Sequence, residues 1–227
     1  MRHIDRVLLV GAFGLFCSPA FAEMPKIDWS LEDAIRQIDQ QADNFESAMA
    51  RVQIVRKGAD GTVAESVGGD GFINEDGDMR FSQDGGNRVV VVDRKTVSDY
   101  DKAAGTVNEY SLSKHKNRLE PYYRFGFSVP VRDMQDRYLF TILGEESVGE
   151  MRTLVFELTP TKDDERAVIA KIRLWIDQGS WMPRRQEFSL ADRSITTVDY
   201  TAVARNLRLN PELFSDSWPR GTKKVKN

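Results

Sequence analysis

Residues 151–190 carry the clearest structural pattern in the chain; they read MRTLVFELTP (151–160), TKDDERAVIA (161–170), KIRLWIDQGS (171–180) and WMPRRQEFSL (181–190). Apolar and polar residues alternate in this stretch with the period of two that is typical of β-strands. One face collects Leu154, Phe156, Leu158, Ile172, Leu174 and Ile176. Because Gln178-Gly179 is typical of a tight hairpin turn, the stretch predicts three antiparallel strands that cover something with one face only.

The same alternation predicts further strands on both sides of this stretch, which brings the total to about eleven. Turn signals such as Asp76-Gly77 separate them, and their ranges are 48–57, 62–74, 79–82, 88–93, 97–100, 106–111, 138–143 and 195–204. Ahead of the strands, Ser30 and Asp33 resemble a capping box for a helix that runs to Phe45 with one apolar face. An apolar helix face has to be buried, and a one-sided sheet is the expected partner.

Two segments interrupt or end this series of strands. Residues 112–137 are first charged and then aromatic, which predicts a short helix or two and an irregular loop over one opening of the sheet. Residues 206–214 are expected to form a terminal turn that fixes Leu213 and Phe214, and residues 219–227 a loose basic tail. The expected fold class is therefore mainly β (α+β).

The first residues of the chain predict export. A positively charged start precedes the apolar run Val7 to Phe16, and Ala20-Phe21-Ala22 is typical of a signal-peptide cleavage site. The run is too short to anchor the chain in a bilayer. We therefore expect cleavage after Ala22, a periplasmic location, and a single domain over residues 23–227.

Cys17 raises the alternative of a lipoprotein signal. That signal requires a small residue before the cysteine, and Phe16 stands there, so export as a soluble protein is the favoured interpretation. The chain has no other cysteine, and once the signal is removed neither a disulfide framework nor thiol chemistry is expected.

Composition and spacing argue against several classes of function. The chain has 32 basic and 35 acidic residues and a net charge of −3, without a basic stripe, so no nucleic-acid partner is expected. His115 is the only histidine after the signal and lies in a charged run, which disfavours a Ser-His-Asp relay and a zinc site. Acidic clusters such as 75–78 fall at expected turns. We expect neither an enzyme nor a cofactor.

Aromatic residues spread over the whole domain leave two alternatives open: a filled core, or the wall of a pocket for an apolar ligand.

Four features carry a family resemblance: EDGDMRFS (75–82), VVVDRKTVSDYD (90–101), LVFELTP (154–160) with IRLWID (172–177), and NLRLNPELF (206–214) followed by PRG (219–221). With the predicted layout, they resemble the outer-membrane lipoprotein carrier family (LolA-like proteins). The resemblance implies a half-open antiparallel β-barrel of about eleven strands with an N-terminal helix and a mid-chain helical lid.

A LolA-like protein is a periplasmic carrier, so the resemblance implies a monomer that moves lipid or acylated lipoprotein cargo from an inner-membrane donor complex to an outer-membrane acceptor. The same fold also resembles the sensor domain of periplasmic regulators, which is the alternative function. Residues 30–45 and 112–137 are expected to form the lid, and Arg80 matches an arginine that holds the lid by hydrogen bonds. The candidate cavity residues are Ile35, Ile38, Phe72, Arg80, Phe81, Tyr100, Leu154, Phe156, Leu174, Trp181 and Phe188.

Overall fold

A computed structural model describes residues 28–115 and 119–227 of the chain. The predicted signal peptide (1–22), its cleavage site and Cys17 lie outside the described residues. The helices are α1 (Leu31–Asp43) and α2 (Asp163–Arg166), with short 3-10 turns η1 (Asp84–Gly86), η2 (Glu120–Arg124), η3 (Val131–Asp133) and η4 (Pro211–Phe214).

Twelve strands make up the rest of the regular structure in the described residues. Their bounds are β1 (Ser47–Lys57), β2 (Val63–Asn74), β3 (Met79–Gln83), β4 (Arg88–Val92), β5 (Thr96–Asp101), β6 (Thr106–Ser111), β7 (Tyr138–Val148), β8 (Met151–Pro160), β9 (Ile169–Asp177), β10 (Pro183–Leu190), β11 (Ile195–Arg205) and β12 (Lys223–Lys226).

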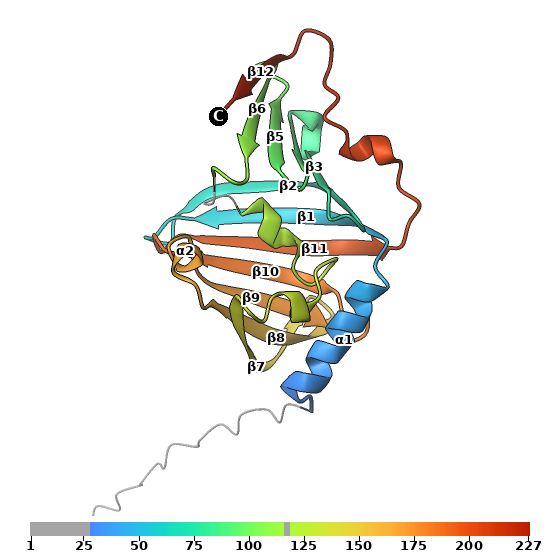
Figure 1. The fold of residues 1–227 in the computed structure, drawn as a ribbon, viewed down its shortest axis with the longest axis vertical. Coiled ribbons are helices and arrows are strands. Elements are labelled where there is room, and N and C mark those ends of the chain that lie inside the picture. The colour runs from blue at the N-terminus through green and yellow to red at the C-terminus, as the bar shows by residue number, and fades with distance from the viewer. Residues whose placement is uncertain (1–27, 116–118) are drawn as a thin grey trace, which may run out of the picture.

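These strands form one open sheet in the order β12-β6-β5-β4-β3-β2-β1-β11-β10-β9-β8-β7 (Figure 1). All neighbours pair antiparallel except β12 and β6, which are parallel. The expected mainly β fold with a half-open sheet and an N-terminal helix is confirmed. In Figure 1, α1 and the segment with η2 and η3, residues 119–137, lie on one side of the sheet, in front of its lower half.

Helix α1 begins where the sequence predicted. The Ser30 hydroxyl accepts a hydrogen bond from the Asp33 amide at 3.0 Å, which satisfies one of the donors that a helix start leaves unpaired. At the other end the Asn44 side-chain amide donates to the Gln40 carbonyl at 2.7 Å. Between these caps Ala34 and Ile38 are buried, so the predicted apolar face is the one that packs.

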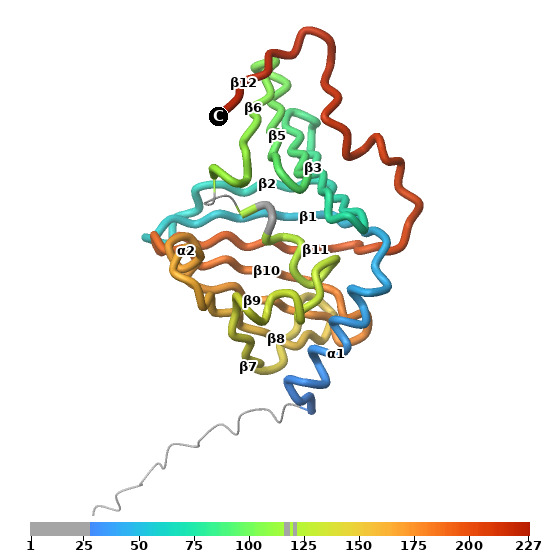
Figure 2. The backbone as a smooth tube through the Cα atoms, in the orientation of Figure 1, coloured from blue at the N-terminus to red at the C-terminus, as the bar shows by residue number. Residues whose placement is uncertain are grey.

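The predicted loose tail is wrong for its last residues, because Lys223–Lys226 forms the twelfth strand. Beyond β11 the chain passes η4 beside β3 and returns to the edge of the sheet beside β6 (Figure 2). Lys224 forms ion pairs with Glu109 and Asp216 at 2.8 and 2.5 Å. The Trp218 ring stacks on Tyr100 with a centroid distance of 5.1 Å. The backbone of an edge strand is exposed to pairing with other chains, and β12 covers that edge of β6.

Arg80 also holds this C-terminal segment. Its guanidinium donates to the Leu213 carbonyl at 3.0 Å and to the Ser82 hydroxyl at 3.1 Å. Burial lowers the pKa of the Arg80 guanidinium. The role that the resemblance implied for Arg80 therefore needs correction: among the described residues, its hydrogen bonds run to Ser82 of the same strand and to the C-terminal segment, and not to the predicted lid.

We expect Arg80→Leu to release the C-terminal segment while leaving the sheet folded, because a charge-assisted hydrogen bond to Leu213 is lost. Limited proteolysis should then cut residues 206–222 faster than in the parent protein. Arg94→Leu is the matched control, since Arg94 is exposed and pairs with Asp76 at a turn. Equal cleavage rates for the two variants would contradict the role given to Arg80.

Candidate functional site

One side of the sheet, here called the inner face, is covered by α1 and by residues 119–137, the covering segment. The two are joined at η3, where the Asp39 carboxylate accepts hydrogen bonds from the Val131 and Arg132 amides at 2.5 and 3.4 Å. The Arg132 guanidinium donates to the Asp43 carboxylate and lowers its pKa. Farther along, Arg137 forms an ion pair with the buried Glu165 of α2.

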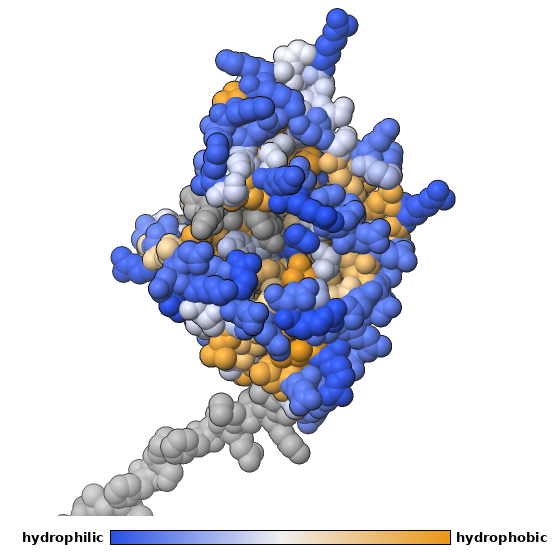
Figure 3. Space-filling model, viewed as in Figure 1, coloured by the Kyte–Doolittle hydropathy of each residue, from blue (hydrophilic) through white to orange (hydrophobic). Residues whose placement is uncertain are grey.

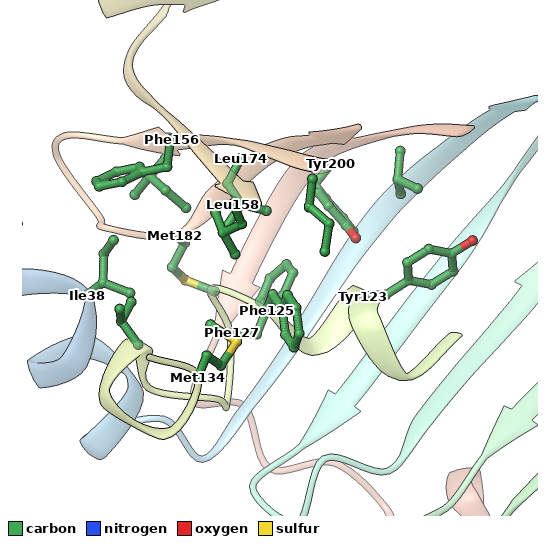
Figure 4. Packing of buried hydrophobic residues seen from close by; sticks show 14 of the residues in the cluster. Ile38, Tyr123, Phe125, Phe127, Met134, Phe156, Leu158, Leu174, Met182 and Tyr200 are labelled. Atoms are coloured by element: carbon green, nitrogen blue, oxygen red, sulfur yellow. The ribbon is translucent and has the colours of Figure 1, made fainter. Parts of the chain in front are cut away.

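The covering segment fills the inner face over β8 to β10. Phe125, Phe127 and Met134 point from the segment toward the sheet, where Leu158 of β8 and Met182, just before β10, lie close to them (Figure 4). All five are buried. This half of the molecule is therefore a filled core, which is one of the two alternatives that the sequence left open.

Seven of the eleven predicted cavity residues belong to this filled half. Six are buried core residues, and the seventh, Ile35, packs against them; the six are Ile38, Leu154, Phe156, Leu174, Trp181 and Phe188. Trp181 also contacts Trp29 edge to face, with ring centroids 4.6 Å apart. Tyr100 lies elsewhere, stacked on Trp218.

A cavity of about 90 Å³ lies over the other half of the inner face. Its volume is several times the roughly 10–15 Å³ that one water molecule requires. The strands β1 to β4 form its wall, and Tyr123 and Phe127 of the covering segment close its side. Apolar residues gather in the middle of this face beside the covering segment, within a mainly hydrophilic surround (Figure 3). The second alternative, the wall of an apolar pocket, therefore applies to the part of the sheet formed by β1 to β4.

Small residues on two paired strands create this space. Ala50 of β1 stands opposite Gly71 of β2, and Val52 stands opposite Gly69. A Cβ atom at Gly71 would lie 2.6 Å from Val52 Cγ2, and one at Gly69 would lie 2.7 Å from the Phe81 ring. Because the two glycines lack side chains, Val52 and the Phe81 ring can pack directly against the backbone of β2. The short side chains of Ala48 and Ala50 leave the volume above β1 empty.

Three of the predicted cavity residues border this cavity: Phe72, Arg80 and Phe81. Strand alternation places the side chains of Phe72 and Arg80 on the outer face of the sheet, so Phe81 alone of the predicted set has an inward side chain here. Most of the lining was not predicted, including Ala48, Ala50, Val52, Ile54, Ile73, Met79, Val90, Tyr123, Phe127 and Tyr200. The available signal was the run of small residues at inward positions of two adjacent long strands.

Gln186 fastens the covering segment to the sheet. Its side chain is 0% exposed, on the inner face of β10. The Gln186 amide nitrogen donates to the Phe125 carbonyl at 2.6 Å and to the Tyr123 carbonyl at 3.4 Å, and its oxygen accepts from the Tyr200 hydroxyl at 2.7 Å. Burial raises the pKa of Tyr200, which keeps its hydroxyl protonated as a donor. A buried amide with these partners satisfies carbonyl groups that the irregular covering segment cannot pair by itself.

We expect Gln186→Leu to loosen the covering segment, because the hydrogen bonds from Gln186 to the Phe125 and Tyr123 carbonyls would be lost. The free energy of unfolding should fall by about 1–3 kcal/mol, and amide exchange should accelerate most in residues 119–137. Gln53→Leu serves as the control, since Gln53 is exposed on β1 and donates to Ser66 at 3.1 Å. Unchanged exchange in residues 119–137 would contradict this role for Gln186.

The described residues contain no group of three or more His, Cys, Asp or Glu side chains placed to hold a metal ion. Within the same part of the chain, no helix is both long enough and apolar enough to cross a membrane. His115 lies edge to face against Tyr110, with ring centroids 5.4 Å apart.

Comparison with known sequences gives two matches. A protein-family model described only as an uncharacterized protein matches residues 128–216. An uncharacterized protein of Methanocaldococcus jannaschii is 23% identical over 144 residues, which cover 63% of this chain and 39% of that protein. The chain thus spans about two fifths of the length of this curated relative.

Solved structures share the fold. An uncharacterized conserved protein from Thermus thermophilus matches with a TM-score of 0.54 and 12% identity, over 88% of this chain and 100% of that one. A LolA superfamily protein from Nitrosomonas europaea matches with a TM-score of 0.42 and 12% identity, over 82% of this chain and 98% of that one.

Proposed function

We propose that this protein binds the acyl chains of a lipid or of a lipid-modified protein in the cavity over β1 to β4 and carries them between membranes in the periplasm. The single observation that carries the proposal is the cavity itself. Its wall is built mainly of aliphatic and aromatic side chains, and small residues on β1 and β2 keep it open. An apolar cavity of this kind suits a hydrocarbon ligand. The proposed carrier function involves binding and release, without a catalytic step.

The energetics favour a movable cover. Each methylene group that leaves water contributes about 0.8 kcal/mol, so a long acyl chain gains on the order of 10 kcal/mol. The cavity of about 90 Å³ has to widen before it can admit a whole chain. Gln186 and Asp39 hold the covering segment by hydrogen bonds, and its buried Phe125 and Met134 anchor it in the filled half. A local displacement of the segment at Tyr123, beside the cavity, would widen the cavity without exposing that core, which reconciles tight capture with release.

Ala50→Phe should fill the cavity without unfolding the protein. Ala50 is a buried, inward-facing residue of the lining, so a phenyl ring there occupies the ligand space. We expect affinity for an apolar fluorescent probe to fall at least about tenfold, the effect of losing roughly two methylene contacts. Native mass spectrometry should also lose any lipid adduct that the parent protein carries.

Met49→Phe is the matched control for this substitution. Met49 precedes Ala50 on β1 and is 37% exposed, on the opposite side of the strand. It should leave probe affinity and lipid adducts unchanged. If the two variants bound the probe as tightly as the parent protein, the cavity over β1 to β4 would not be the binding site.

Transfer between vesicles tests the carrier role separately from binding. The parent protein should move a fluorescent acylated peptide from donor to acceptor vesicles faster than spontaneous exchange, and Ala50→Phe should abolish the gain. Stable binding of the peptide without transfer would contradict a carrier and favour a sensor built on the same cavity.

A further inference from the structure

The inward side chains of β1 change from small and apolar to charged along the length of the strand. They are Ala48, Ala50, Val52, Ile54 and Arg56, and all five line the cavity. At about 3.3 Å per residue, the strand covers roughly 26 Å from the first to the last of them. The cavity therefore has an apolar end and a charged end, as an amphiphilic ligand does.

A network of four side chains forms the charged end. Arg56 Nη1 lies 2.8 Å from Glu65 Oε2, and Arg88 Nη1 lies 3.4 Å from Glu65 Oε1. Arg88 Nε and Nη2 donate to the two Asp99 oxygens at 2.8 and 2.7 Å. The carboxylates hold both guanidinium groups in place at the mouth of the cavity, where their side chains are 42% and 34% exposed. Each guanidinium carries five N–H donors in a planar fork that matches carboxylate and phosphate oxygens.

A second cavity of about 400 Å³ adjoins the charged end and shares Arg56 and Arg88 with the first. Lys57, Ser194 and Thr196 also line it, and no acidic side chain belongs to its lining among the described residues. Among the described residues, the lining of the second cavity thus carries three cationic side chains and no carboxylate. This second space holds cationic and hydroxyl side chains beside apolar ones such as Leu190 and Ile195, whereas the first is mainly apolar.

We propose that the ligand is an amphiphile with an anionic headgroup, whose chain lies in the apolar cavity and whose carboxylate or phosphate lies in the adjoining space against Arg56, Lys57 and Arg88. The inference rests on the proposed function and adds to it the class of headgroup and the direction in which the chain enters. Partial exclusion of water at this mouth strengthens the attraction between the headgroup and the guanidinium groups.

The preference for an anionic headgroup can be tested by measuring how tightly the parent protein binds three amphiphiles that share a 16-carbon acyl chain. They are palmitate, palmitoyl-lysophosphatidylglycerol and the uncharged monopalmitoylglycerol. We expect at least one anionic ligand to bind about tenfold or more tightly than the uncharged one, with a preference that weakens as salt is added. Tighter binding of palmitate identifies a fatty-acid carboxylate, and tighter binding of the lysolipid identifies a phospholipid phosphate.

The double substitution Arg56→Gln/Lys57→Gln removes two positive charges and leaves Arg88 paired with Glu65 and Asp99. It should lower affinity for the anionic ligands about tenfold and leave the uncharged ligand unaffected. Arg51→Gln is the control on the same strand, because Arg51 lies on the outer face and pairs with Asp70 and Asp84 at 2.9 and 2.8 Å. Arg51→Gln should change neither affinity.

The outcomes separate this inference from the proposed function. Equal affinity of the parent protein for all three amphiphiles, or an equal loss for all three in the double variant, would overturn the headgroup site while the acyl-chain cavity stands. Failure of all three to bind would overturn the proposed function as well. A photoreactive group on the methyl end of palmitate should label the peptide that holds Ala48 and Ala50, and labelling beside Arg56 would reverse the proposed direction.

Discussion

The structure depends on one constraint: the inner face of the sheet is larger than the area that α1 and the covering segment, the described elements lying on it, can cover. Twelve strands present this face, and α1 with the covering segment is what lies on it. Where these elements lie, over β8 to β10, the side chains interlock into a buried core. Over β1 to β4 the covering segment reaches only the side of the face, through Tyr123 and Phe127, and the apolar strands enclose a cavity.

A hollow half and a filled half serve different purposes in one domain. The filled half supplies the apolar burial from which a domain of this size gains most of its stability. The domain can therefore remain folded with glycines and alanines in β1 and β2, although these residues pack less and have a lower strand propensity than larger ones. Gln186 lies where the two halves meet and couples them, since it joins β10 to the carbonyls of the covering segment and to Tyr200 beside the cavity.

The two faces of the upper strands carry separate tasks. Inward residues of β3 and β4, such as Phe81 and Val90, line the cavity. Outward residues Arg80, Tyr100 and Glu109 bind the C-terminal segment, which closes the edge at β6. Because alternation separates these two sets, the C-terminal segment can hold the edge without entering the ligand space.

The pattern of the sequence alone was enough to predict most of the strands and the helix start at Ser30, because period-two and helical spacing are local properties of the chain. The expected one-sided sheet was wrong for the upper strands, where outward Val91, Tyr100 and Val107 are also buried. It did not reveal β12, since four residues rich in lysine become a strand only when β6 is beside them. Nor did it locate the cavity among the aromatic residues. Large side chains such as Phe156 and Phe188 became core because the covering segment reaches them, whereas Ala50 and Gly71 became the cavity wall because strand pairing sets them side by side. Which half of the inner face is filled and which half holds a cavity depends on where the covering segment lies. That position is set by tertiary contacts between residues far apart in the sequence.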